Sequence, residues 1–91
     1  MFLYEKGRYY QLDDHGKLVA EVTFRKTKDL VYALDHTWVD PSLRGQGIAK
    51  KLVDQVVLHA KNEGMKIDPV CPYALKLFES DSSYHDIWYK K

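Results

Sequence analysis

Several features common in proteins are missing from this sequence. It contains one cysteine, Cys71, so no disulfide bond can form within the chain, as is typical of a reducing compartment. No apolar run approaches the ~18 residues that a membrane-spanning helix requires. The first ten residues already include Glu5, which argues against a signal peptide or an anchor. We therefore expect no membrane partner and a cytoplasmic location.

A strong net charge is also missing. The chain has 14 Lys and Arg residues against 13 Asp and Glu residues, and its formal charge is +1. A charge this small gives no field that attracts nucleic acid, so we expect no nucleic-acid partner. The histidines at positions 15, 36, 59 and 85 show no ligand spacing with Cys71, so no metal site is expected. What remains is an ordinary globular composition, 45% hydrophobic, in 91 residues. This predicts a single domain spanning residues 1–91.

The first half of the chain predicts strands. Residues 9–12 and 17–26 read as a hairpin around the turn "DDHG", and alternate side chains of the second strand are apolar. Residues 30–39, "LVYALDHTWV", are apolar on both faces. A strand of this kind is typical of the centre of a sheet that is covered on both sides.

The second half alternates between helix and strand. Apolar residues recur at helical spacing over residues 47–63. Residues 65–70 then form a short buried strand, expected to be parallel to the previous one because a helix lies between them. Pro72 begins a second helix, and residues 83–90 are able to add a last strand. The predicted order is β-β-β-α-β-α, with the terminal β left open.

The stretch "VDPSLRGQGIAKKLV" (39–53) joins the central strand to the long helix. Gly45 and Gly47 allow a sharp turn and place no side chain over its N–H groups. The first N–H groups of the helix have no partner within the helix and lie at its positive end, beside Arg44, Lys50 and Lys51. This pattern predicts a cradle for a pyrophosphate. The alternative is that the two glycines only shape the start of the helix.

The same residues carry a resemblance. "Arg44-Gly45-Gln46-Gly47-Ile48-Ala49" matches the Q/R-x-x-G-x-G/A signature of the GCN5-related N-acetyltransferases. With "DHTWVDPSLRGQGIAKKLV" and "DPVCPY", the chain resembles the small single-domain branch of that family over residues 35–80. The resemblance implies an α+β fold, a mixed sheet in the order given above with a splayed central strand.

The resemblance also implies a cofactor, acetyl-CoA, and the residues that bind it. The splayed edge of the central strand would hydrogen-bond the pantetheine arm through backbone groups of Trp38 and Val39. The N–H groups of the following turn would hold the pyrophosphate. The residues of that turn are Arg44, Gly45, Gln46, Gly47, Ile48 and Ala49, with Lys50 beside them.

Family members usually carry a basic group near the central strand that deprotonates the acceptor amine, often a Glu. Here Trp38 stands where a carboxylate would help, and His36 and Asp35 are the nearby candidates. A histidine pKa of about 6.5 suits a base at neutral pH. The alternative is that His36 is a satisfied core residue.

The second helix departs from the family pattern, which has an Asn near the cofactor arm and a Tyr that protonates the leaving thiolate. Aligned on Ala74, Cys71 falls at the Asn and Phe78 at the Tyr. Phe78 cannot donate a proton, so the role of the acid is either vacant or met by another residue, and Tyr73 is one candidate. Cys71 is either a nucleophile that accepts the acetyl group or a buried thiol that packs as a small apolar residue.

The acceptor side also differs from larger relatives, which place two helices between their first strands. Here only "DDHG" links those strands, so we expect an open site or one closed by a partner subunit, in a monomer or weak homodimer. An open site suits an amine on a protein or peptide. The sequence therefore predicts an N-acetyltransferase that works by direct attack of the amine on acetyl-CoA. The alternative is a non-catalytic acyl-CoA-binding or protein-interaction module.

Overall fold

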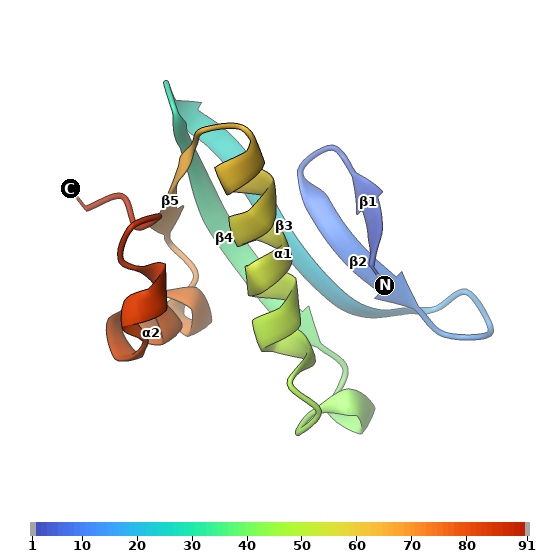
Figure 1. Ribbon diagram of the computed structural model, residues 1–91. Helices are drawn as coiled ribbons and strands as arrows, with labels where there is room; N and C mark the ends of the chain where they lie inside the picture. The colour runs from blue at the N-terminus through green and yellow to red at the C-terminus, as the bar shows by residue number, and fades with distance from the viewer. Residues whose placement is uncertain (1, 91) are drawn as a thin grey trace.

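The computed structural model describes residues 2–90 and contains one five-stranded sheet and two α-helices (Figure 1). The predicted order is confirmed, and one short strand precedes it. The elements are β1 (Leu3–Glu5), β2 (Arg8–Leu12), β3 (Leu18–Lys28), β4 (Val31–Val39), the 3-10 turn η1 (Pro41–Leu43), α1 (Ile48–Asn62), β5 (Lys66–Pro69), α2 (Pro72–Ser80) and the 3-10 turn η2 (Ser82–Tyr84).

The strands follow one another across the sheet in sequence order. The first four are antiparallel, and β5 runs parallel to β4 because α1 carries the chain back between them. The predicted hairpin is confirmed, with β3 reaching two residues further than expected, to Lys28. The sequence did not reveal β1, because its three residues are all exposed and show no alternation.

An extra residue in β4 decides which side chains face the helices. Thr23 pairs with His36 and Phe24 pairs with Leu34, so Asp35 has no counterpart on β3 and forms a bulge. A bulge reverses the alternation of side chains beyond it. Leu34 and Val39 therefore both lie in the core, whereas His36 is exposed on the opposite face.

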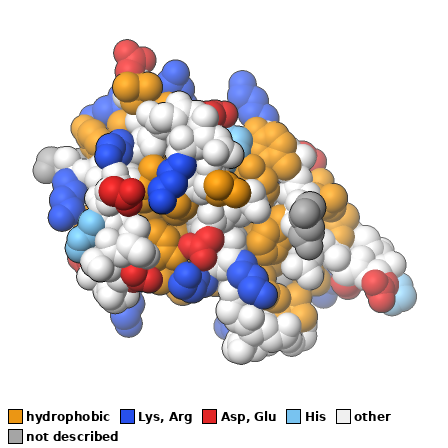
Figure 2. Space-filling model, viewed as in Figure 1, with side chains coloured by type: hydrophobic (Ala, Val, Ile, Leu, Met, Phe, Trp, Pro, Cys, Tyr) orange, Lys and Arg blue, Asp and Glu red, His pale blue; other side chains and the backbone are white. Residues whose placement is uncertain are grey.

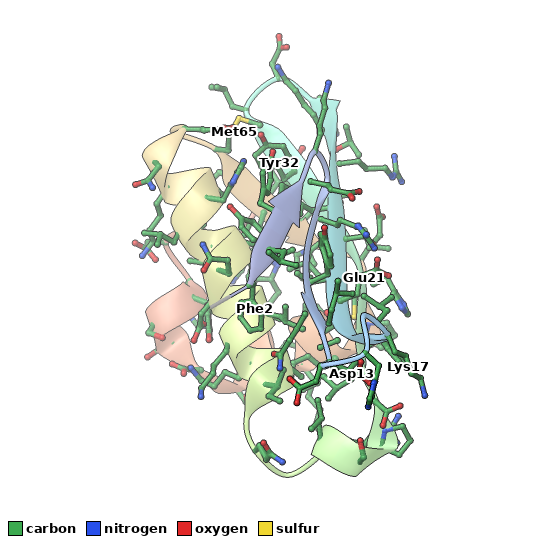
Figure 3. All side chains as sticks on the ribbon, turned by 90° about the vertical axis from the view of Figure 1, so that its right-hand side faces the viewer. Phe2, Asp13, Lys17, Glu21, Tyr32 and Met65 are labelled. Carbon is green, nitrogen blue, oxygen red and sulfur yellow. The ribbon has the colours of Figure 1, made fainter. Side chains whose placement is uncertain are left out.

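The expectation of a sheet covered on both faces is wrong. Both helices pack on one side, and the far side of β3 and β4 carries polar side chains such as Glu21, which Figure 3 shows pointing away from α1. The apolar appearance of residues 30–39 has two causes. Val31 and Ala33 are buried within the open face itself, and the bulge turns Trp38 to that face as well.

One hydrophobic core lies between the sheet and the helices. The stripe of α1 predicted from helical spacing is confirmed, and it packs on Val22 and Leu34 of the sheet. Phe78 of α2 is fully buried, with its ring stacked on Tyr84 at a centroid distance of 4.9 Å. Each such large side chain contributes roughly 1.5–3 kcal/mol by leaving water. The members of the α1 stripe are Leu52, Val53, Val56, Val57 and Ala60.

The C-terminal segment forms a single β-bridge and not the full strand that residues 83–90 were able to add. Residues 82–84 form η2, since the Tyr84 ring turns into the core. After it, a single bridge joins Ile67 to Trp88, and the Ile67 N–H donates to the Ile87 carbonyl at 2.8 Å. Among residues 2–90, no helix combines the length and the apolarity needed to cross a bilayer.

Candidate functional site

The loop before α1 presents backbone N–H groups to solvent. Gly45 and Gly47 have φ angles of 86° and 74°, which side chains other than glycine rarely adopt. A Cβ on either glycine would meet nothing within 4 Å, so the space above the loop is open. Gly47 caps α1 without any side-chain hydrogen bond, and the N–H of Lys51 bonds the Gly47 carbonyl at 3.1 Å. The N–H groups of residues 45–50 are therefore available to a ligand, whereas the Arg44 N–H already donates to the Pro41 carbonyl.

Side chains fix the path of this loop. The Asp40 carboxylate accepts hydrogen bonds from the Ser42 N–H, at 2.9 Å, and from its hydroxyl. These bonds hold the pKa of Asp40 below its usual value. The Arg44 Nε donates to the Val39 carbonyl at 3.2 Å, which ties the loop to the end of β4. No acidic residue lies in the first turn of α1, so nothing there repels an anion.

The two lysines of the first turn are used differently. The Lys50 ammonium forms an ion pair with Asp54 at 3.0 Å, one turn further along α1, and lies 5.6 Å from the centre of the Tyr84 ring. The hydrogen bond with Asp54 raises the pKa of Lys50. The backbone N–H of Lys50 thus lies in the first turn of α1, whereas its ammonium group is paired with Asp54. Lys51 lines a shallow cleft together with Gln46 and Ile48.

The sheet opens beside this loop. Pairing of β4 with β5 ends at Leu34 and Pro69, and the Cys71 N–H then donates to the Leu34 carbonyl at 2.9 Å. From residue 35 to its end at Val39, β4 runs on without pairing to β5. The expected splay of the central strand is therefore present (Figure 1).

The register of β4 corrects which backbone groups line the opening. The Asp40 N–H donates to the Val19 carbonyl, and the inward-facing residues of an antiparallel pair alternate. Trp38, two residues earlier and paired with Glu21, therefore directs its N–H and C=O at β3 and not at the opening. Thr37 and Val39 direct theirs at the opening. Thr37 was missed from the sequence, because the shift in register that exposes it comes from the bulge.

Cys71 lies at the inner end of the opening, as the cap of α2. Its side chain is buried, and its Sγ lies 3.6 Å from the Thr37 Oγ1. Tyr73, in the first turn of α2, is 41% exposed, and partial burial raises the pKa of its hydroxyl. Phe78 is enclosed in the core against Tyr84. The thiol, the Thr37 hydroxyl and α2 thus share the helix side of β4.

His36 lies on the other side of β4. It is exposed, so the alternative of a core histidine is wrong. Its neighbour Asp35 accepts a hydrogen bond from the Arg25 Nε at 3.0 Å. The candidate residues therefore divide between the two faces of β4, with His36 on the open face and Cys71 on the helix face. A group lying in the opening would be reached from both sides.

The surface charges of the helix side are mixed in sign. Figure 2 shows Lys and Arg interspersed with Asp and Glu over the helix side, with no large field of one sign. Within residues 2–90, no three His, Cys, Asp or Glu side chains are arranged to hold a metal ion.

Known proteins share this arrangement. A sequence model of the family described as GCN5-related N-acetyl-transferase matches residues 8–87. The solution structure of a "GCN5-like putative N-acetyltransferase" from Staphylococcus aureus is 33% identical, with a TM-score of 0.84 over 100% of this chain and 89% of that one. No curated protein matches the chain in sequence.

Larger proteins share the fold. A ribosomal-protein-alanine N-acetyltransferase from Brucella melitensis is 27% identical, with a TM-score of 0.59 over 86% of this chain and 64% of its own. Rv2747 from Mycobacterium tuberculosis, solved with CoA and NLQ, is 15% identical, with a TM-score of 0.59 over 89% of this chain and 66% of its own. The glycine loop, the splayed strand and the match over residues 8–87 lead to one conclusion: the chain belongs to the GCN5-related N-acetyltransferase family.

Proposed function

We propose that this protein transfers the acetyl group of acetyl-CoA to an amine by direct attack of that amine on the thioester. The observation that carries the proposal is that a helix start without a side-chain cap lies beside an unpaired strand edge. The N–H groups of residues 45–50 suit a pyrophosphate, and the edge of β4 that begins beside them suits an extended amide chain. Coenzyme A has a pyrophosphate followed by an extended amide-containing arm, which is the same order.

The pantetheine arm would run along the opening between β4 and β5. Its amides would exchange hydrogen bonds with the backbone of Val39 and Thr37, as an added strand does at a sheet edge. The thioester would then lie near Cys71, where the two strands come together. The crystal complex of Rv2747 with CoA supports the choice of cofactor, since that protein has the same fold.

The chemistry needs a base, an oxyanion donor and an acid. The amine nitrogen attacks the carbonyl carbon, and His36 on the open face takes the proton that the nitrogen loses. Backbone N–H groups on the open edge of β4 stabilise the oxyanion. The intermediate collapses by breaking the C–S bond, and the departing thiolate takes a proton from the Tyr73 hydroxyl. A tyrosine hydroxyl carries its proton at neutral pH, and partial burial raises the pKa of Tyr73 further.

The acceptor would approach across the open face of the sheet. None of the main clefts of residues 2–90 is lined by His36 or Trp38, and both helices lie on the other face. A small metabolite would find little to surround it there. We therefore propose a protein or peptide amine as the acceptor.

A second candidate function rests on Phe78. Because this residue fills the position of the family tyrosine and is fully buried, the protein could bind acyl-CoA without turning it over. In that case the glycine loop and the strand edge would still bind the cofactor, and His36 and Tyr73 would have no catalytic role.

Calorimetry of CoA binding tests the cofactor. Gly47→Glu places a carboxylate over the loop, and we expect CoA affinity to fall at least about tenfold, equal to ~1.4 kcal/mol. Gly64→Glu is the matched control. Gly64 also has a positive φ and open space around its Cα, and it lies at the other end of α1. The CoA affinity of the Gly64→Glu variant should therefore not change. Equal affinities in the two variants would contradict the cradle.

Turnover separates the two candidate functions. Release of free CoA should rise with peptide amines, and His36→Gln should lower kcat/KM about 100-fold, the low end for loss of a general base. His15→Gln, at an exposed turn, is the control. Saturable CoA binding without turnover on any peptide or polyamine would favour the binding module.

A further inference from the structure

A second cleft lies at the far end of α1 from the glycine loop. It has a volume of about 820 Å³ and opens between the β1–β2 turn, the start of β4 and the last turns of α1. This size falls within the usual range for small-molecule sites, roughly 300–1,000 Å³. Since α1 has 15 residues, about 20 Å of helix separates the cleft from the loop. Figure 3 shows Tyr32, one of its walls, at the same end of the sheet as Met65.

Aromatic rings line this cleft. Tyr4, Phe24 and Tyr32 contribute their rings, and His59 of α1 lies among them, with ring centroids 5.6, 5.1 and 5.7 Å from theirs. Tyr4 is 51% exposed although it is a large apolar ring in a 91-residue domain. Phe24 is itself buried, so Tyr4 and Tyr32 are the rings that offer a planar ligand stacking and edge contacts.

The polar groups inside the cleft already bond one another. The Tyr9 hydroxyl and the His59 Nδ1 lie 2.8 Å apart, and the His59 Nε2 lies 3.2 Å from a Glu63 oxygen. The Tyr32 hydroxyl donates to the other Glu63 oxygen. Both oxygens of the Glu63 carboxylate are thus engaged by side chains of the cleft itself.

The free charges at the rim are positive. Lys6 and Lys26 line the cleft, both are exposed, and neither has an acidic partner within 4.0 Å in the described part of the chain. Arg25 also lines the cleft, but its guanidinium is paired with Asp35. An aromatic lining with two unpaired ammonium groups at its edge fits a ligand with a ring at one end and a negative charge at the other.

We propose that this cleft is a binding site for a small anion that carries an aromatic ring, such as an aromatic carboxylate. The ring lies against the exposed parts of Tyr4 and Tyr32, and the carboxylate faces Lys6 and Lys26. The site is separate from the acetyl-transfer site, and its ligand need not be a substrate of that reaction.

Three probes of one shape test the charge that the cleft selects. Benzoate, benzamide and benzamidine share a ring and a planar head group, and they are anionic, neutral and cationic. Amide chemical shifts of the full chain should move around Gly7 and Phe24 on addition of benzoate, with a dissociation constant of about a millimolar. Benzamide should bind at least about fivefold more weakly, and benzamidine more weakly still. Binding of benzamidine as tight as benzoate, or no benzoate shifts at these residues, would overturn the proposal.

Variants test the residues. The double variant Lys6→Gln with Lys26→Gln should weaken benzoate binding about five- to tenfold, as expected for two exposed ion pairs. Lys17→Gln with Lys76→Gln changes the net charge by the same amount at exposed sites outside the cleft and should bind benzoate normally. Tyr4→Ala should weaken benzoate and benzamide alike, because it removes ring contact only.

Amide spectra of each variant show whether it folds, and CoA affinity separates this site from the first. The Lys6 and Lys26 double variant should bind CoA like the parent, since the glycine loop is about 20 Å away. If that variant loses CoA and benzoate binding together, the two sites are not separate and the proposal fails. If benzoate binds as expected and CoA does not bind at all, only the proposed function fails.

Discussion

Cys71 is the residue whose position can be read in two ways. Its sulfur is buried and lies 3.6 Å from the Thr37 hydroxyl, as a packed thiol would. It also lies where β4 and β5 come together, which is where the proposed complex would place the thioester. A thiolate can accept an acetyl group from another sulfur, so position alone leaves a covalent route in competition with direct attack.

Mass spectrometry after incubation with acetyl-CoA distinguishes the routes. Under direct attack we expect no acetyl group on Cys71, and Cys71→Ala should retain turnover to within about tenfold, since only a small buried side chain is lost. A protein heavier by one acetyl group that loses it when an amine is added would instead establish the covalent route. Thr37→Val is the companion variant, because it removes the neighbouring hydroxyl and leaves the thiol.

Single residues were predicted unevenly. Gly45 and Gly47 can be read from the sequence because glycine adopts a left-handed backbone readily and leaves the surface of the turn open, and the structure has both features. The sequence does not decide whether His36 is a base or a core residue, because the exposure of His36 depends on the bulge at Asp35. Thr37 was not predicted at all. No local pattern in "DHTWV" marks an unpaired extra residue, because the bulge arises from pairing with Thr23 and Phe24 of the preceding strand.

At the scale of elements, α1 both carries the glycine loop and forms much of the core. Its buried stripe faces the sheet, and its outer side holds the Lys50–Asp54 ion pair and exposed Leu58. Long elements with strong periodicity such as α1 and β3 were predicted closely. Strand β1 has three exposed residues, and the last strand is one bridge, so neither carries a pattern that the sequence could show.

Two leucines on α1 test how much its packing stabilises the domain. Leu52 is fully buried, and Leu52→Ala should lower the free energy of unfolding by about 2–5 kcal/mol through lost contacts and a cavity. Leu58 is 53% exposed on the same helix, and Leu58→Ala should change it by no more than ~0.5 kcal/mol. Urea unfolding of both variants checks this. Similar values for the two would mean that α1 is not packed as described.

At the scale of the whole molecule, two tyrosines link stability to alkaline pH. Hydrogen bonding to Glu63 first, and burial second, raise the pKa of Tyr32 to about 12. Burial first, and then the bond to Asp54, raise the pKa of Tyr84 to about 12. In the unfolded chain both would titrate near the ordinary value of about 10. Between these values the folded protein keeps protons that the unfolded chain releases.

Stability should therefore be complete below about pH 10 and should fall as the pH rises from 10 through 12. Thermal unfolding as a function of pH, followed with tyrosinate absorbance, measures the decline. Tyr84→Phe should reduce the loss of stability between about pH 10 and 12. Tyr89→Phe, near the C-terminus, should show the same loss as the parent protein. A melting temperature that stays level to pH 12 would mean that these hydroxyls are not held as the structure has them.

The division of the candidate residues by β4 has a kinetic consequence. The proposed cofactor enters along the edge of the strand from the loop at α1, and the acceptor arrives across the bare side of the sheet. Neither route obstructs the other, so each substrate can associate with the free enzyme. Initial velocities at varied concentrations of both should give intersecting lines, and dead-end inhibitors of either substrate should indicate random addition. β4 therefore lies between the routes by which the two reactants approach.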